Sequence, residues 1–162
     1  MLSDDYVQFE YKSKPGIHIH DPIRFIKKHK DAKTPTKAHE NDCCYDLYSV
    51  EDVLIKPMER KLIDTGIVTE MPDFVEGQIR PRSGLAYKHG ITVLNGPGTI
   101  DSPFRNTWKV LLINLSEEDY KVSVGDRIAQ VKFSAVFHVT LEEVEEVEET
   151  DRGEGGFGST GR

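Results

Sequence analysis

Apolar residues occupy every second position of the stretch VKFSAVFHVTL, residues 131–141. Most of the positions between them are polar. Successive side chains of a β-strand point to opposite faces, whereas one face of a helix recurs every three to four residues. This period of two constrains the fold more than any other feature, because it predicts a long strand with one buried face. The apolar positions are Val131, Phe133, Ala135, Phe137, Val139 and Leu141.

Other stretches of the chain also have strand character, and short turn signals separate them. WKVLLINL (108–115) is a continuous apolar run, typical of a strand covered on both faces. RKLIDTGIVTEM (60–71) and FVEGQIRP (74–81) are rich in strand-forming residues. Turns are predicted at MPDF, KHG, NGPG, SEED and VGD. Many short strands in a single domain of 162 residues predict an all-β fold, such as a sandwich, barrel or jelly roll.

Charge and cysteine content limit the classes of function. The formal net charge of −7 argues against non-specific binding to nucleic acid, which requires a basic surface. It leaves room for a small anionic ligand held by a few arginines together with a metal cation. No apolar run approaches the ~20 residues of a membrane span, and the acidic N-terminus lacks the apolar region of a secretory signal. With the adjacent Cys43 and Cys44, these features predict a reducing compartment, cytoplasmic or nuclear, and no membrane partner.

The two ends of the chain differ in composition from the predicted core, which we place at residues 23–150. Residues 1–22 are predicted to form an N-terminal extension. Its GIHIHDP segment (16–22) is interpreted as an edge strand, with metal binding by its two histidines as the alternative. Segment 141–150 carries six glutamates and is interpreted as a solvated strand or linker, although its apolar spacing also permits a short helix. Residues 151–162 form a glycine-rich C-terminal arm.

The arm DRGEGGFGSTGR contains five glycines, one aromatic ring and two hydroxyl groups. It is not a P-loop of the Walker type, because neither a lysine nor a helix follows the last glycine. A flexible linker is the simple alternative, but a linker has no use for the large ring of Phe157. That ring could stack on a nucleobase, and Arg152 could bind phosphate oxygens in a bidentate manner. We therefore predict a lid that closes over a nucleotide.

Two internal motifs could take part in the chemistry of such a ligand, and each has a structural alternative. RPRSGLA (80–86) places a guanidinium, a hydroxyl and a bare backbone together, which suits a phosphate. A turn with a surface arginine explains it equally well. NGPGTIDSPFR (95–105) combines a hairpin-like turn with Asp101, a candidate general base beside an aromatic residue. A purely structural hairpin is the favoured interpretation of that motif when it is taken alone.

Two further motifs complete a recognisable set. NDCCYDLYS (41–49) offers Asp42 and Asp46 as ligands of metal-bound water, and GDRIAQV (125–131) offers Gln130 near a strand. Taken together, CCYDLYS, PRSGLA, NGPGTIDSPFR, GDRIAQ and RGEGGFGSTG, in this order and spacing, resemble the five motifs of the homotrimeric dUTPase family, the deoxyuridine triphosphate nucleotidohydrolases. The last motif is the most specific of the five. The resemblance covers roughly residues 22–160.

The resemblance implies an all-β, jelly-roll-like β barrel with a flexible C-terminal arm, assembled as a homotrimer with shared active sites. It implies an enzyme that cleaves dUTP to dUMP and pyrophosphate, usually with Mg²⁺. Such an enzyme keeps uracil out of DNA and supplies dUMP for thymidylate synthesis. The expected location is the cytoplasm, or the cytoplasm or nucleus of the host if the source is viral.

The resemblance also implies roles for particular residues. Asp101 falls on the carboxylate that activates the water attacking the α-phosphorus, and Asp46 on the aspartate that holds the metal through water. The positions that would contact the substrate are Arg82, Ser83, Gly84, Asn95, Gly98, Thr99, Ile100, Phe104, Lys109, Gln130, Arg152, Phe157, Gly158, Ser159 and Thr160. Three residues depart from the family pattern: Phe104 replaces a tyrosine, Asn106 a glycine, and Cys44 a small residue.

Two other functions compete with this interpretation. A dCTP deaminase shares the fold, but the uracil-type hairpin and Asp101 argue against it. A jelly-roll interaction module that signals through closure of the arm would need Arg152 and Phe157 but not Asp101. The presence of Asp101 therefore favours the hydrolase.

Overall fold

A computed structural model describes residues 22–156. The histidine-bearing segment before Pro22 lies outside the described residues, and so do the predicted arm residues Phe157, Gly158, Ser159 and Thr160. The elements are, in chain order, β1 (Arg24–Lys27), β2 (Tyr45–Tyr48), β3 (Val53–Ile55), β4 (Arg60–Asp64), β5 (Ile67–Glu70), β6 (Val75–Arg80), α1 (Ser83–His89), β7 (Ile91–Val93), β8 (Gly98–Ile100), β9 (Lys109–Asn114), β10 (Tyr120–Val122) and β11 (Arg127–Ala135).

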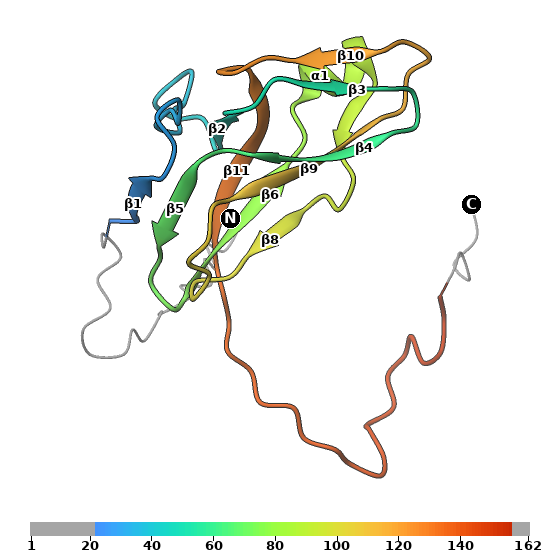
Figure 1. Ribbon diagram of the computed structural model, residues 1–162. Coiled ribbons are helices and arrows are strands. Elements are labelled where there is room, and N and C mark those ends of the chain that lie inside the picture. The colour runs from blue at the N-terminus through green and yellow to red at the C-terminus, as the bar shows by residue number, and fades with distance from the viewer. Residues whose placement is uncertain (1–21, 157–162) are drawn as a thin grey trace, which may run out of the picture.

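The described strands pair in four small antiparallel sheets around one core (Figure 1). The largest has the order β2-β11-β6-β8, and a second has the order β4-β9-β7. β1 pairs with β5, and β10 pairs with β3. The predicted all-β, jelly-roll-like class is confirmed, although the described strands do not close into a single barrel.

The core forms where the buried faces of these sheets meet. Apolar residues at alternate strand positions point inward, which is why strands as short as three residues can contribute to it. Trp108 is the largest fully buried side chain, at 1% exposure. It packs among Leu47, Ile55, Ile63, Met71, Ile79, Ile91, Val93, Val110, Leu112, Val122, Ile128, Ala129 and Val131.

Two strand predictions need correction. The strand predicted over 131–141 ends at Ala135, and Phe137, Val139 and Leu141 are exposed rather than buried. The run 108–115 is not covered evenly on both faces: in β9 every second residue from Val110 is fully buried, and the residues between are half-buried. A run of apolar residues cannot by itself distinguish two covered faces from one covered face, because coverage depends on what packs against the strand.

The helix α1 was not predicted from the sequence, which indicated a turn after RPRSGLA. Its seven residues begin directly after Arg82 and end at Gly90, which adopts a left-handed φ of 64°. None of its residues is buried, so the sequence has no helical repeat of apolar residues from which the helix could be predicted. The predicted turns at MPDF, NGPG, SEED and VGD all fall between strands.

Segment 136–156 leaves the body of the molecule after β11 and contains neither helix nor strand (Figure 1). Every residue of 141–150 is exposed, so the linker interpretation of this acidic stretch is confirmed and the helical alternative is wrong. No helix in the described part of the chain has the length and apolarity that a membrane crossing needs.

Candidate functional site

A polar pocket of about 320 Å³ lies at one end of the four-stranded sheet. Three separate parts of the chain form it: the loop before β2 with the strand itself, the segment after β6, and β11. Its lining contains both arginine and aspartate, which suits a charged, phosphorylated ligand better than an apolar one. The lining residues are Ala38, Asp42, Cys43, Cys44, Asp46, Arg82, Ser83, Gly84, Arg127 and Gln130.

Asp46 binds two arginines at once. Nε of Arg82 donates to its Oδ1 at 3.0 Å, and Nη1 of Arg127 donates to its Oδ2, also at 3.0 Å. Nη1 of Arg82 donates in addition to the backbone carbonyl of Arg127 at 3.1 Å. The Asp46 side chain is only 15% exposed, whereas that of Arg127 is 48% exposed. The carboxylate thus fixes two guanidinium groups whose remaining N–H donors can reach a ligand in the pocket.

Strand register explains why these groups meet. Gln130 of β11 lies directly opposite Asp46 of β2 on one side and opposite Arg80 of β6 on the other. Residues directly opposite each other in a sheet place their side chains on the same face. A register irregularity falls between Arg127 and Ala129, at the end of β11 that lines the pocket.

Gln130, Ser83 and Gly84 complete the pocket in different ways. Nε2 of Gln130 donates to the carbonyl of Pro81 at 2.8 Å, which holds the segment that precedes α1. Ser83 and Gly84 are exposed at the start of that helix. A Cβ at Gly84 would meet no atom within 4 Å, so packing within the described chain does not explain the glycine.

The loop before β2 carries Asp42 and the two cysteines. The backbone N–H of His39 donates to Oδ2 of Asp42 at 2.9 Å, and this hydrogen bond holds the pKa of Asp42 below its usual value. Burial and the neighbouring Cys43 raise the pKa of the Cys44 thiol. Cys44 therefore stays a neutral thiol at neutral pH, which agrees with a packing role rather than a reactive one.

The turn predicted in NGPGTIDSPFR is present and joins β7 to β8 through a cis peptide bond at Gly96–Pro97. It is not a β-hairpin, because β7 pairs with β9 and β8 pairs with β6 in a different sheet. Gly98 is buried, and an added Cβ there would lie 3.3 Å from the side-chain amide nitrogen of Asn95. Thr99 is exposed and Ile100 is half-buried. β8 lies at the edge of its sheet, so one edge of its backbone faces away from β6.

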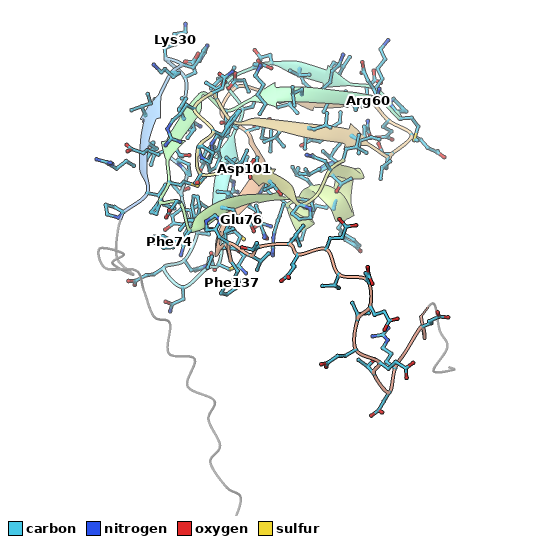
Figure 2. All side chains as sticks on the ribbon, turned by 90° about the horizontal axis from the view of Figure 1, so that it is seen from below. Lys30, Arg60, Phe74, Glu76, Asp101 and Phe137 are labelled. Carbon is cyan, nitrogen blue, oxygen red and sulfur yellow. The ribbon has the colours of Figure 1, made fainter. Side chains whose placement is uncertain are left out.

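Asp101 follows β8 and is exposed. Because Ile100 pairs with Gly77, the chain register brings Asp101 beside Glu76 of β6, as Figure 2 shows. The backbone N–H of Phe104 donates to the carbonyl of Asp101 at 3.1 Å, and the Arg105 guanidinium donates to the carbonyl of Phe104 at 3.0 Å. The tight loop that results leaves the Phe104 ring 41% exposed.

The candidate base and the polar pocket do not meet within one chain. Asp101 is absent from the pocket lining. Asp46 lies on β2 and Asp101 follows β8, and these strands are three positions apart in the sheet. Neighbouring strands lie ~4.8 Å apart, so three strand spacings alone separate them by ~14 Å. Asp46 is level with Arg80 of β6 whereas Asp101 is level with Glu76, so the offset along the strands increases this distance further. A single described chain therefore does not bring Asp101 to this pocket.

The other predicted residues lie elsewhere. Lys109 begins β9 in the second sheet, is exposed, and stands opposite Asp64 in the register. Arg152 is exposed beyond the acidic segment, where its Nε donates to the carbonyl of Gly155 at 3.0 Å. Arg127, in contrast, lines the pocket but was not singled out from the sequence, although it is part of the motif GDRIAQ. An arginine after a turn gives no sequence signal until its carboxylate partner is known.

The fold and the pocket indicate an all-β protein whose two carboxylate-bound arginines suit a phosphorylated small molecule. Comparison with known proteins shows which family of such proteins the chain resembles. A family model described as dUTPase matches residues 30–161. A deoxyuridine 5'-triphosphate nucleotidohydrolase from Clostridium kluyveri is 56% identical over 132 residues, 82% of this chain and 92% of that protein. One from Clostridium novyi is 55% identical, covering 83% of this chain and 95% of its own.

Solved structures agree. A dUTPase of Staphylococcus bacteriophage 80alpha, determined with dUpNHpp, superimposes with a TM-score of 0.82 at 25% identity and covers 88% of this chain and 99% of its own. A dUTPase from phage phi11 of S. aureus, described with a structural Mg(II) ion, shares the fold with a TM-score of 0.73 at 22% identity, covering 78% of this chain and 98% of its own. The chain belongs to the dUTPase family. The predicted family and enzyme class are confirmed.

Proposed function

We propose that this protein hydrolyses dUTP to dUMP and pyrophosphate, and that the polar pocket binds the triphosphate. The arginine pair held by Asp46 carries the proposal. A triphosphate brings several negative charges into one place, and fixed guanidinium donors neutralise them without reorganising. Ser83 and the bare backbone of Gly84 add donors beside Arg82 in the same pocket. Arg152, Ser159 and Thr160 of the arm would close over the phosphates, with Phe157 stacked on the base.

Asp101 is the proposed general base. It accepts a proton from a water whose oxygen attacks the α-phosphorus, while the bond from that phosphorus to the bridging oxygen breaks and pyrophosphate leaves. The exposure of Asp101 supports this role, because a base must be reachable by water and substrate in the open protein. The short loop to Phe104 fixes the backbone next to it.

β8, together with the turn that precedes it, is the proposed uracil-binding element. Backbone donors and acceptors on the outer edge of β8 can pair with the edge of a base in the way they would pair with another strand. Gly98, Thr99 and Ile100 would supply these groups, and Asn95 packs beside Gly98. Cytosine presents an amino group where uracil has a carbonyl, so fixed backbone groups would be left unpaired. Phe104 would pack on the deoxyribose and exclude a 2′-hydroxyl, and Lys109 would contact the substrate from β9.

Mg²⁺ is the proposed metal. Among the described residues, no three His, Cys, Asp or Glu side chains come together as a metal-binding group. This donor set fits a magnesium ion that is bound mainly by substrate phosphates, because Mg²⁺ commonly uses only one or two protein carboxylates. Asp46 is proposed to hold such an ion through water, beside the two arginines that donate to its oxygens. When bound, the ion would neutralise phosphate charge.

We further propose that the protein is a homotrimer with shared active sites. The separation of Asp101 from the pocket within one chain supports this, because a second copy can bring its own Asp101 to the pocket of the first. Exposed apolar side chains also support an assembly, because a second copy could cover them. Leu62, Phe137, Val139 and Leu141 are all more than half exposed. A cyclic arrangement repeats one heterologous contact and closes. We also propose that the protein acts in the cytoplasm, where its activity would limit dUTP.

Pyrophosphate release from dUTP, dCTP, dTTP and UTP in the presence of Mg²⁺ tests the proposal. We expect turnover of dUTP, with the other three nucleotides at least ~100-fold slower, because a mismatched base or sugar leaves polar groups unpaired or clashes. Formation of dUTP or dUMP from dCTP would instead identify a deaminase. Nucleotide binding without pyrophosphate release would identify an interaction module.

A further inference from the structure

We propose that the acidic segment 142–151 of one copy docks on a basic surface of a second copy and so guides the arm toward the pocket of that copy. The guiding of the arm rests on the proposed function, but the contact between the two segments can be measured without any nucleotide. The basic surface is defined by Lys27, Lys28, Lys30, Lys33 and Lys37.

The basic surface stands out in a chain whose formal net charge is −7. Lys27, Lys28, Lys30 and Lys33 are exposed, and Lys37 is half-buried. In the described part of the chain, none of the five forms an ion pair with a carboxylate. The only acid among them, Asp31, lies 3.8 Å from the ring of His29. Five positive charges thus fall within residues 27–37 without an ion-pair partner in the described part of the chain. Lys33 donates to the carbonyl of Gly125 at 3.1 Å, and the charge of Lys37 helps to lower the pKa of Asp42.

The acidic segment is the complementary part of the same sequence. It contains six glutamates and Asp151, with no lysine or arginine among them. All of residues 141–151 are exposed, and no glutamate of this segment forms an ion pair within residues 22–156. Concentrating like charges is unfavourable unless solvent or an opposite charge compensates it.

The direction of the chain points to a second copy. The segment begins at the far end of β11, where the N–H of Val136 donates to the carbonyl of Phe74 at 2.8 Å and Nε2 of His138 lies 3.0 Å from the carbonyl of Asp73. Figure 2 shows Phe74 and Phe137 together at one end of the molecule and Lys30 at the other. From Phe137 the segment runs away from the body rather than back toward β1.

Docking would place the arm where it is needed. The basic surface ends at Lys37, and the next residue, Ala38, already lines the polar pocket. The acidic segment ends at Asp151, and the next residue is Arg152 of the arm. Contact between the two segments would therefore bring the arm of one copy to the mouth of the pocket of another. The lysines would also offset the repulsion between an acidic linker and a bound triphosphate.

Several charges are needed because each contributes little. Exposed ion pairs are individually weak and are screened by salt, so one lysine could not hold the segment. Within an assembly, however, the segment is tethered near the surface, and a tethered contact forms at a high effective concentration. The result would be a reversible guide for the arm rather than a permanent clamp.

Zero-length cross-linking tests the contact directly. Equal amounts of ¹⁴N- and ¹⁵N-labelled full-length protein are unfolded together, refolded, and treated at low salt with a carbodiimide that joins lysine amines to carboxylates. We expect peptides linking residues 27–37 to residues 142–151, with roughly half of mixed isotope as random mixing of neighbours predicts. Lys61, whose Nζ lies 2.6 Å from Oε1 of Glu59, provides a positive control within one chain.

The proposal would be overturned if the Lys61–Glu59 link is detected but no link joins residues 142–151 to the basic surface. Links of a single isotope only would also overturn it, because the segment would then fold back on its own chain. Salt-sensitive binding of a fluorescent DNA oligonucleotide to the lysines, without links between copies, would assign the surface to an external polyanion instead.

Charge reversal tests the consequence for the arm. Lys27→Glu, Lys28→Glu and Lys30→Glu together should raise the KM for dUTP about fivefold, as the loss of three weak pairs predicts. Glu142→Lys, Glu143→Lys and Glu145→Lys together should do the same. Combining both sets should return KM to within about twofold of the original, because the opposite charges face each other again.

The matched control reverses three exposed lysines elsewhere, Lys56, Lys88 and Lys121, for the same change in net charge. Its KM should stay unchanged if the effect is local. Additive losses in the combined variant, or an equal effect in the control, would contradict docking between these segments. A protein that shows no dUTP hydrolysis would refute the proposed function, while the cross-linking result would still decide the contact.

Discussion

At the scale of single residues, Asp46 is the side chain on which the pocket geometry depends most. Its two oxygens accept from two arginines that come from different elements. Asp46→Asn keeps the shape but loses the charge, so both guanidinium groups are released. We expect the KM for dUTP to rise by about tenfold or more, since charge-assisted hydrogen bonds are the strong ones. Steady-state kinetics at several Mg²⁺ concentrations measures this.

The same experiment separates two roles for Asp46. If Asp46 acts mainly by holding metal-bound water, excess Mg²⁺ should restore the KM of the variant. If it mainly positions Arg82 and Arg127, excess Mg²⁺ should have no effect. Asp119→Asn, an exposed aspartate remote from the pocket lining, is the matched control and should behave as the unmodified protein.

Asp101 provides a second prediction at this scale. Asp101→Asn should lower kcat by ~10²–10⁴-fold, the usual contribution of a positioned general base, because the amide cannot accept the proton. Its exposure means that folding should be unaffected, and dUTP should still bind. Single-turnover kinetics with a calorimetric binding measurement checks both parts. Unchanged kcat would remove Asp101 from the mechanism.

At the scale of elements, Gly66 and Gly84 show that glycine can occupy a position for different reasons. Gly66 joins β4 to β5 with a φ of 67°, and a Cβ there would lie 2.8 Å from Cβ of His29 and 2.9 Å from Cβ of Ala32. Gly84 lies in the first turn of α1 with open space around it. The first is required by the backbone and its packing, and the second is free of both constraints.

Alanine at the two positions should therefore give opposite results. Gly66→Ala should lower the free energy of unfolding by about 2 kcal/mol or more, because it combines an unfavourable φ with a steric clash. Gly84→Ala should leave stability unchanged or slightly raised, since alanine is the better helix former, while raising the KM for dUTP. Thermal denaturation and kinetics on both variants test the pair. A destabilised Gly84→Ala variant with normal KM would show that its role is structural.

At the scale of the whole molecule, the separated base and pocket lead to a complementation experiment. Asp101→Asn and a truncation before Asp151 are each expected to be inactive. After they are unfolded and refolded together in equal amounts, about a quarter of the sites should recover, because random mixing pairs an intact Asp101 with an intact arm in ~1/2 × 1/2 of cases. Sedimentation of the truncated chain is the control for assembly. Mixed trimers without any activity would exclude shared sites.

Local patterns in the sequence determined much of this protein. The strand periodicity, the turn residues and the glutamate-rich linker all follow from neighbouring residues, and the turns at residues 71–74, 95–98 and 124–126 fall where the pattern puts them. The five motifs identified the family in the same way, because chemistry of this kind requires fixed residue types at fixed spacing. The role of each motif residue stays a prediction from that resemblance.

Tertiary structure alone decided which residues meet. Nothing near Arg127 in the sequence reveals that it shares Asp46 with Arg82, since the three come from β11, β2 and the segment after β6. Nothing in the local sequence showed that β11 ends at Ala135, because the apolar alternation continues to Leu141. The strand ends there because its partner strand β6 begins at Val75, which lies opposite Ala135. Periodicity reports the preference of a segment for a conformation. Register and contact depend on distant partners, and no local pattern contains that information.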